Sequence, residues 1–235
     1  MNLHSLFSSM TIAQTEIELR HRLMDNLDRY FGVQRWGIYL VDEANNLISS
    51  DTKGVSDRFI ETYQAIGKSV DPVLKYVREY HAPAHEELVL PKGTWKQSQL
   101  YQRCCVEGNH EHIMTGPIVG DGKLIGTVNF ARVGSSSAFN FQDLSNLTAV
   151  CLHLSACMAS LRSQFSLQLN DYSKLLTKRE IQIAELVACG LTNAEIGKEL
   201  WISHNTVKQA LKKMFRKLKV SSRIMMIEKL RTHQK

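Results

Sequence analysis

Residues 202–220 read ISHNTVKQALKKMFRKLKV and hold six lysines and arginines without one acidic residue. Four apolar residues recur at intervals of four, three and four: Val207, Leu211, Met214 and Leu218. This spacing predicts an amphipathic helix with one apolar stripe for a small core. Crowding of like charges destabilises a helix, and phosphate groups would offset that cost. The stretch therefore favours a helix that lies against a polyanion over one with a merely solvated basic face.

Start signals for further helices surround this stretch. Thr177-Lys-Arg-Glu180 and Thr192-Asn-Ala-Glu195 are capping boxes, in which the threonine caps the backbone and the glutamate reaches back. The first box predicts a helix that ends at Gly190, and the second a helix through Leu200. Ser203 or Asn205 caps the third helix, and Ser221 or Ser222 begins a fourth. Four short helices joined by tight turns are typical of a helix-turn-helix domain.

The charge is unevenly distributed along the chain. From residue 170 onward there are 14 lysines and arginines against 6 acidic residues, whereas the first 169 residues carry 15 against 17. The basic part alone therefore predicts a polyanionic partner. No window approaches the roughly 18 apolar residues of a membrane span, and the first residues lack the pattern of a secretory signal. We therefore expect a cytoplasmic protein without a membrane partner.

The first 163 residues alternate helical and strand patterns. The expected elements are a helical stretch over Leu3–Phe31, a buried strand over Trp36–Val41, a helix from Asp71-Pro72 to Tyr80, a helix over Lys96–Cys105, a hairpin of His112–Val119 and Lys123–Phe130, and a helix over Phe141–Leu161. Together they predict an α+β sandwich around one antiparallel sheet. Residues 164–175 are polar and weakly patterned, so we expect a linker there, between domains 1–163 and 176–235.

The basic part resembles the LuxR/GerE-type DNA-binding domain. The resemblance rests on five segments: Leu176–Glu180, Gly190–Ile196, Ile202-Ser203, Thr206–Lys208 and Lys217–Val220 with Arg223. Two positions depart from the family, because Ala210 stands where it usually has histidine and Lys213 where it usually has asparagine. The family implies a dimeric transcription regulator whose third helix enters the major groove.

The resemblance also assigns roles on the third helix. Lys208 and Gln209 are the candidates for base edges, since a lysine can donate to guanine and a glutamine can pair with adenine through two hydrogen bonds. The remaining candidates suit phosphates, which position a protein without specifying sequence: Ser203, Asn205, Thr206, Lys212 and Arg216.

The N-terminal part resembles a GAF sensor domain, through Gly116–Phe130 and Phe141–Leu147. It therefore implies a GAF/PAS-like α-β-α sandwich. A second resemblance competes with this one: Phe59, Tyr63 and Asp71-Pro-Val73 are similar to the acyl-homoserine lactone-binding domain of quorum-sensing LuxR proteins, where an aspartate holds the ligand amide. Phe59 replaces the usual tryptophan of that domain, and no tryptophan follows Pro83 nearby. Asp71 alternatively serves only as a helix cap, because Asp-Pro is typical of a helix start.

Several other residues have both a functional and a structural interpretation. The candidates for lining an amphipathic ligand pocket are Trp36, Tyr39, Tyr63, Asp71, Trp95 and Tyr101, and ordinary core packing is the alternative for the aromatic ones. His110 and His112 share a strand face, but no further metal ligand is evident. We predict no metal site, no cofactor and no enzymatic activity, because the sequence shows no nucleophile–base set and no phosphate loop.

The sequence thus predicts a DNA-binding transcriptional regulator, a homodimer, whose N-terminal domain receives a signal. Its expected partners are double-stranded DNA and a second copy of the chain, with RNA polymerase as a further candidate; the effector is not identified. Two alternatives remain open: an acyl-homoserine lactone receptor, and a regulator controlled by a partner protein without any small-molecule ligand.

Overall fold

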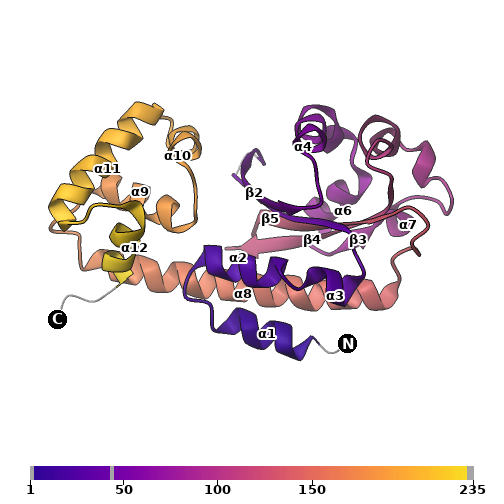
Figure 1. Ribbon diagram of the computed structural model, residues 1–235, viewed down its shortest axis with the longest axis horizontal. Helices are drawn as coiled ribbons and strands as arrows, with labels where there is room; N and C mark the ends of the chain where they lie inside the picture. Colours follow the sequence, from indigo (N-terminus) through magenta and orange to yellow (C-terminus); the bar gives the residue numbers. More distant parts are fainter. Residues whose placement is uncertain (1–2, 43–44, 232–235) are drawn as a thin grey trace. The chain divides into compact units, whose positions relative to one another are not determined.

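The computed structural model describes residues 3–42 and 45–231 (Figure 1). The chain forms two compact units, and neither is a single continuous stretch. One unit takes in the residues up to Ile12 together with Arg20–Ala156, and the other takes in Ala13–Leu19 together with the residues from Cys157 onward.

A five-stranded antiparallel sheet organises the first unit. Its strands are β1 (Arg35–Val41), β2 (Leu47–Lys53), β3 (Ala84–His85), β4 (His110–Gly120) and β5 (Lys123–Val133), in the order β2-β1-β5-β4-β3. The predicted hairpin is confirmed as β4 and β5, and Asp121 and Gly122 both have positive φ in its turn. Strand β2 was not predicted. It pairs with β1 at the sheet edge, where its largely polar residues need no apolar pattern.

Helices and helical turns lie on both sides of this sheet. The helices are α1 (His4–Thr11), α2 (Glu16–Met24), α3 (Leu27–Phe31), α4 (Asp57–Thr62), α5 (Lys68–Val70), α6 (Pro72–Tyr80), α7 (Glu86–Val89) and α8 (Phe141–Asn170). Three tighter or wider turns complete the set: the π-helical η1 (Tyr63–Gly67) and η3 (Tyr101–Cys105) and the 3-10 turn η2 (Trp95–Gln97). In Figure 1, α3 and the first part of α8 lie on one side of the sheet, and α4 and α6 lie on the other.

Two helix predictions were too simple. The stretch Leu3–Phe31 is three helices. The Thr15 hydroxyl accepts a hydrogen bond from Glu18 N at 3.0 Å, which marks the start of α2 after the break that follows α1. The stretch Lys96–Cys105 is not one helix either, since the Ser98 hydroxyl accepts a hydrogen bond from Tyr101 N at 3.1 Å and starts a second turn. The predicted helix after Asp71-Pro72 is confirmed as α6, with Asp71 as its N-cap.

Helix α8 is longer than predicted and continues to Asn170, into the segment expected to be a linker. Its most apolar stretch is long and apolar enough to cross a membrane by length and composition, which the sequence interpretation had overlooked, and 28% of that stretch is buried. One such helix is weak evidence for a membrane segment, since core helices of soluble proteins share these properties. Against the sheet, Gly116 lets β4 approach α8 so closely that a Cβ there would lie 2.4 Å from Cys151 Sγ.

The second unit is a bundle of short helices. After α8 come α9 (Lys178–Ala188), α10 (Asn193–Glu199), α11 (His204–Leu218) and α12 (Arg223–Arg231). The segment Ala13–Leu19 belongs to this unit through Glu16, a buried residue that accepts hydrogen bonds from Arg162 Nε at 2.8 Å and Nη2 at 2.9 Å. The predicted fold class, a GAF-like α+β sandwich followed by an all-α helix-turn-helix domain, is confirmed.

Candidate functional site

Both predicted capping boxes are present in the second unit. Thr177 Oγ1 accepts from Glu180 N at 3.2 Å, and the Glu180 carboxylate accepts from Thr177 N at 2.7 Å. Thr192 and Glu195 repeat the pair at 3.4 and 2.5 Å. Helices α9 and α10 therefore begin where the sequence predicts, and their starts depend on local interactions alone.

The start of α11 is set by Ser203. Its hydroxyl accepts a hydrogen bond from Thr206 N at 3.0 Å and lies 2.9 Å from the Thr206 hydroxyl, so Ser203 rather than Asn205 is the cap. The turn before it depends on Gly197, whose carbonyl accepts from Ile202 N at 2.9 Å. A Cβ on Gly197 would lie 2.8 Å from Ile202 O, so only glycine allows α10 and this turn to approach so closely.

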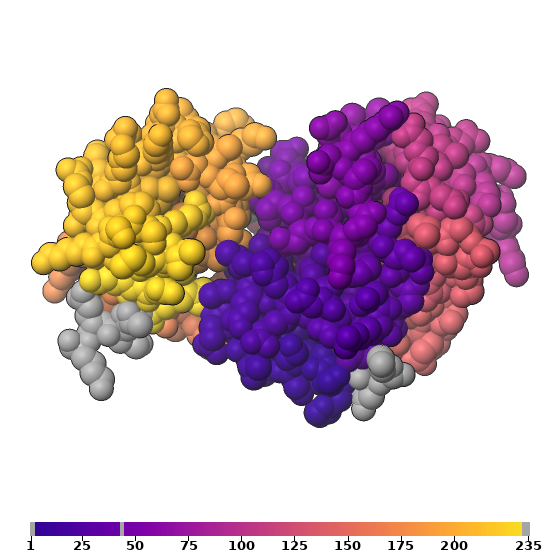
Figure 2. All heavy atoms as spheres, in the orientation of Figure 1, coloured from indigo at the N-terminus to yellow at the C-terminus, as the bar shows by residue number. Residues whose placement is uncertain are grey.

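Helix α11 separates its apolar and basic residues cleanly. The apolar stripe is buried: Val207, Leu211, Met214 and Leu218. The other positions predicted to contact DNA are exposed on the remaining surface: Asn205, Lys208, Gln209, Lys212 and Arg216. Among the residues that the structure describes, Lys208, Lys212 and Arg216 form no ion pair. In Figure 2, the α11–α12 part of the chain, in yellow, presents a broad surface to the viewer.

The basic surface includes residues that the sequence reasoning missed. A shallow groove beside α11 is lined by Thr177, Arg179, Glu180, Thr206, Gln209, Ala210, Lys213, Arg216 and Lys217. Lys213 follows Gln209 by four residues and so lies on the same face of the helix, a signal that the sequence already contained. Arg179 comes from α9 and donates to Leu200 O at 2.5 Å, which fixes it beside the groove.

Lys217 has a different role from the exposed lysines of α11. Its ammonium group donates to Glu180 Oε2 at 2.6 Å and so joins α11 to the start of α9. Burial alone would raise the pKa of Glu180, but the hydrogen bonds from Lys217 and Thr177 lower the pKa of that carboxyl below its usual range. Lys217 therefore contributes to the packing of α11 against the start of α9.

A pocket lies on the opposite face of the sheet from α8, in the first unit. It is a small pocket that is partly open to solvent. Its lining combines aromatic and apolar residues with a few polar ones: Arg35, Trp36, Gly37, Tyr39, Val55, Phe59, Tyr63, Asp71, Leu100, Cys105, His110, Ile113, Thr115, Asn129, Phe130 and Ala131. Such a mixture is typical of small-molecule sites.

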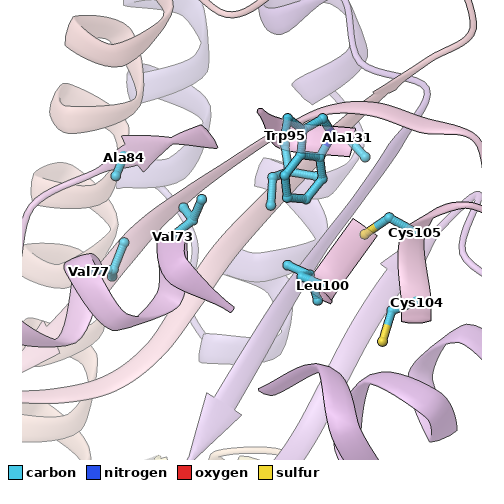
Figure 3. Packing of buried hydrophobic residues seen from close by; sticks show 9 residues of the cluster. Val73, Val77, Ala84, Trp95, Leu100, Cys104, Cys105 and Ala131 are labelled. Atoms are coloured by element: carbon cyan, nitrogen blue, oxygen red, sulfur yellow. The ribbon is translucent and has the colours of Figure 1, made fainter. Parts of the chain in front are cut away.

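Four of the six predicted pocket residues line this space, namely Trp36, Tyr39, Tyr63 and Asp71. Trp36 is one of the lining residues, although successive residues of a strand face opposite sides of the sheet. Its indole N–H donates to Met24 O at 2.9 Å. Trp95 and Tyr101 do not line it. Their rings meet edge to face, 5.5 Å apart, and Trp95 belongs to the neighbouring hydrophobic cluster with Leu100 and Cys105 (Figure 3).

Asp71 is a helix cap that also faces the pocket. Its Oδ1 accepts from Val73 N at 2.9 Å and Leu74 N at 3.0 Å, and its Oδ2 accepts from the Tyr63 hydroxyl at 2.6 Å. Burial raises the pKa of Asp71 despite these hydrogen bonds. The cap interpretation is confirmed, and the role of Asp71 as a ligand anchor stays a prediction.

The two histidines of β4 have separate partners. His110 Nε2 lies 2.8 Å from Arg35 Nη1, whereas His112 Nδ1 lies 2.5 Å from the buried carboxylate of Glu86. A bulge between the two residues separates their environments. Within residues 3–42 and 45–231, no three His, Cys, Asp or Glu side chains gather in a way that could hold a metal ion.

Two families match the chain. Residues 174–230 match the family described as bacterial regulatory proteins, luxR family, and residues 16–158 match the GAF domain. The HTH-type transcriptional regulator AlkS of Alcanivorax borkumensis is 36% identical over 64 residues, which are 27% of this chain and 7% of AlkS. The transcriptional regulatory protein LiaR of Bacillus subtilis is 52% identical over 48 residues, which are 20% of this chain and 23% of LiaR. The matched segments thus span less than a quarter of either relative.

A solved structure extends the similarity to nearly the whole chain. Escherichia coli SdiA has a TM-score of 0.50 and 17% sequence identity, and the match covers 98% of both chains. At this identity the similarity concerns the fold alone.

Proposed function

This chain belongs to the GAF domain family through residues 16–158 and carries a helix-turn-helix domain of the luxR family of bacterial regulatory proteins at residues 174–230, and from that premise we propose that it is a sequence-specific DNA-binding regulator. It works in the cytoplasm as a homodimer. Residues 176–235 bind DNA, and residues 1–163 receive a signal and form the dimer. No catalytic reaction is part of this role, and RNA polymerase is its further partner at a promoter.

The exposed basic face of α11 carries the proposal. Lys208, Lys212 and Arg216 stand in solvent without an ion pair among the described residues, on a helix whose opposite stripe is buried. Such an arrangement leaves a like-charged surface that a phosphate backbone would neutralise. The cap at Ser203 places Lys208 and Gln209 within the first two turns of α11, the end that reaches base edges when such a helix enters the major groove.

Paired substitutions on α11 separate base reading from phosphate binding. Gln209→Ala should relax sequence preference at one base-pair position per half-site, because a good bidentate contact contributes about 1–3 kcal/mol of discrimination. Lys212→Ala should weaken binding to all sequences alike and flatten the dependence of log K on log salt by about one unit. Binding selections over randomised half-sites, followed by titrations at several salt concentrations, measure both effects.

Lys174→Ala is the matched control, since it removes one exposed positive charge outside the four helices and should leave the salt slope unchanged. If Gln209→Ala keeps the wild-type sequence motif while affinity falls uniformly, Gln209 contacts the backbone. An unchanged slope in Lys212→Ala would remove Lys212 from the interface.

An apolar surface on α8 supports the homodimer. Phe141 is 81% exposed and Leu152 is 68% exposed, on a helix whose opposite side is buried. They fall on one face with smaller residues: Thr148, Ala156, Ala159 and Ser163. Exposed large apolar residues on one helix face favour a protein contact surface, and small residues beside them allow a second helix to approach closely.

Leu152→Glu should therefore shift the chain from dimer to monomer, with the dissociation constant raised at least about 100-fold, because a charge at the centre of a helix contact has no partner there. Sedimentation velocity across a concentration series measures the shift. Gln164→Glu adds the same charge on α8 away from the Leu152 face and should leave the dimer intact. A dimer that survives Leu152→Glu unchanged would place the contact elsewhere.

The pocket supports a small molecule as the signal over a partner protein. Its polar groups at Tyr63 and Asp71 lie inside a mostly apolar lining, as in sites that orient a small ligand. The acyl-homoserine lactone alternative draws on the same two residues.

A further inference from the structure

The pocket of the first unit has two polar ends with an aromatic side chain between them. The ring of Phe59 stacks 6.0 Å from Tyr63 on one side and lies 4.6 Å from His110 on the other. Arg35 and Tyr39 point to the same face of β1 and are four residues apart, a distance of about 13 Å along a strand. Tyr63 with Asp71 thus marks one end, and Arg35 with His110 marks the other.

The Arg35 end is positively charged and has no counter-charge of its own. Arg35 donates to His110 Nε2 at 2.8 Å, and within the described residues it forms no ion pair. Burial, together with the Arg35 guanidinium, lowers the pKa of His110 to about 4, so the imidazole is neutral near pH 7 and accepts the hydrogen bond.

The chain keeps space open for this arginine. A Cβ on Gly108 would lie 2.5 Å from Arg35 Nη1 and 2.8 Å from His110 Nε2. With one nitrogen engaged by His110, the guanidinium retains further N–H groups in a planar fork, which suits the two oxygens of a carboxylate. Asp71 is the one carboxylate among the residues that line the pocket, at the opposite end.

The Asp71 end accepts hydrogen bonds. Asp71 Oδ1 already receives two backbone N–H groups, while Oδ2 receives one donor, the Tyr63 hydroxyl. A carboxylate oxygen can accept a second donor, so a ligand N–H or O–H fits beside Tyr63.

We propose that this pocket binds an elongated small organic carboxylate: its carboxylate lies on Arg35, its apolar body packs along Phe59, and an N–H or O–H group donates to Asp71. This inference rests on the proposed sensory role of the N-terminal domain and names the class of its ligand. An uncharged ligand, such as a lactone, would cover Arg35 without supplying a negative charge. The desolvated guanidinium would then weaken binding.

The test uses indole-3-butyrate and its primary amide, two probes of almost equal shape that differ in charge. Each has an indole N–H at one end and an apolar body. Calorimetric titration of the full chain should give an affinity for the acid at least tenfold above that for the amide, because a charge-assisted bidentate hydrogen bond is stronger than a neutral one. Arg35→Gln should remove this preference by weakening the acid alone.

Arg58→Gln is the matched control, since Arg58 is exposed, pairs with Glu107 and does not line the pocket, and it should keep the preference. Equal affinities of the wild-type chain for the two probes, or no binding of either at millimolar concentration, would overturn the proposal without any variant. A preference that survives in a folded Arg35→Gln chain would overturn it as well. DNA affinity measured on the same preparations reports separately on α11, so a failure of the DNA-binding role is distinguishable from a failure of this pocket.

Discussion

Gly197→Val should lower the affinity for the chain's DNA site at least about 100-fold. The turn between α10 and α11 brings Ile202 O to 2.8 Å from the position of a Cβ on Gly197, and both groups are backbone or attached directly to it. Neither can rotate away, so α11 must shift relative to α10, and base contacts tolerate little displacement. Fluorescence anisotropy with a labelled site measures the loss.

Two comparisons make this result specific to the turn. Gly197→Ala introduces the same Cβ with less bulk, so its DNA affinity should lie between those of the wild-type chain and Gly197→Val. Ala194→Val adds a branched side chain at an exposed position of the same helix and should stay within about threefold of wild type, because it meets no neighbouring backbone. Equal losses in Ala194→Val and Gly197→Val would assign the effect to helix propensity instead of the close approach.

Arg132→Met should destabilise the first unit by about 3–5 kcal/mol, the usual cost of leaving buried polar partners uncompensated. Arg132 is 8% exposed, and its guanidinium donates to Phe31 O at 2.7 Å, Ser137 O at 3.1 Å and Ala138 O at 3.0 Å. It also donates to Asp143 Oδ1 at 3.1 Å, at the start of α8. Methionine fills a similar length and replaces none of these donors. Urea unfolding followed by tryptophan fluorescence measures the change, because Trp36 is buried in the same unit.

Arg58→Met is the control for Arg132→Met, because it removes an arginine from an exposed ion pair. Arg58 pairs with Glu107 while 78% of its side chain is exposed, and such pairs contribute about 1 kcal/mol or less. A similarly small decrease in the free energy of unfolding of Arg132→Met would mean that solvent reaches the three carbonyl groups and replaces the guanidinium.

The features that the sequence predicts well are those that depend on neighbours in the chain. The capping boxes at Thr177 and Thr192 and the cap at Asp71 join residues two to three positions apart, so their patterns are visible without a fold. The β4–β5 hairpin is set in the same way, by the turn residues between its strands. The apolar stripe of α11 is equally direct, because helical geometry alone places its members on one face.

The features that the sequence did not predict depend on contacts between distant residues or on apolar patterns that polar residues interrupt. Arg35 and His110 are 75 residues apart and meet through the pairing of β1, β5 and β4. The π-helical turns are another case, since Gly67 is packed under Cys104 and Leu100 from a separate segment.

The apolar pattern of the extended part of α8 was present in the sequence, but polar residues interrupted it. Phe165 and Leu169 are buried at a spacing of four, which continues the helical pattern of the preceding residues. Polar residues between them made the segment resemble a linker.

The segment Ala13–Leu19 has a consequence for where this chain can be divided to make a chimeric protein. Glu16 is 4% exposed, receives two hydrogen bonds from Arg162, and lies 3.4 Å from Cys189 Sγ, so seven residues near the start of the chain complete the unit that ends it. A recombination event that joined residues 164–235 to a foreign sensor would leave Cys189 without that partner. The part left behind would keep the pair of Glu16 and Arg162 but lose the contact of that carboxylate with Cys189. A chimera that keeps these contacts therefore has to exchange two separate segments at once.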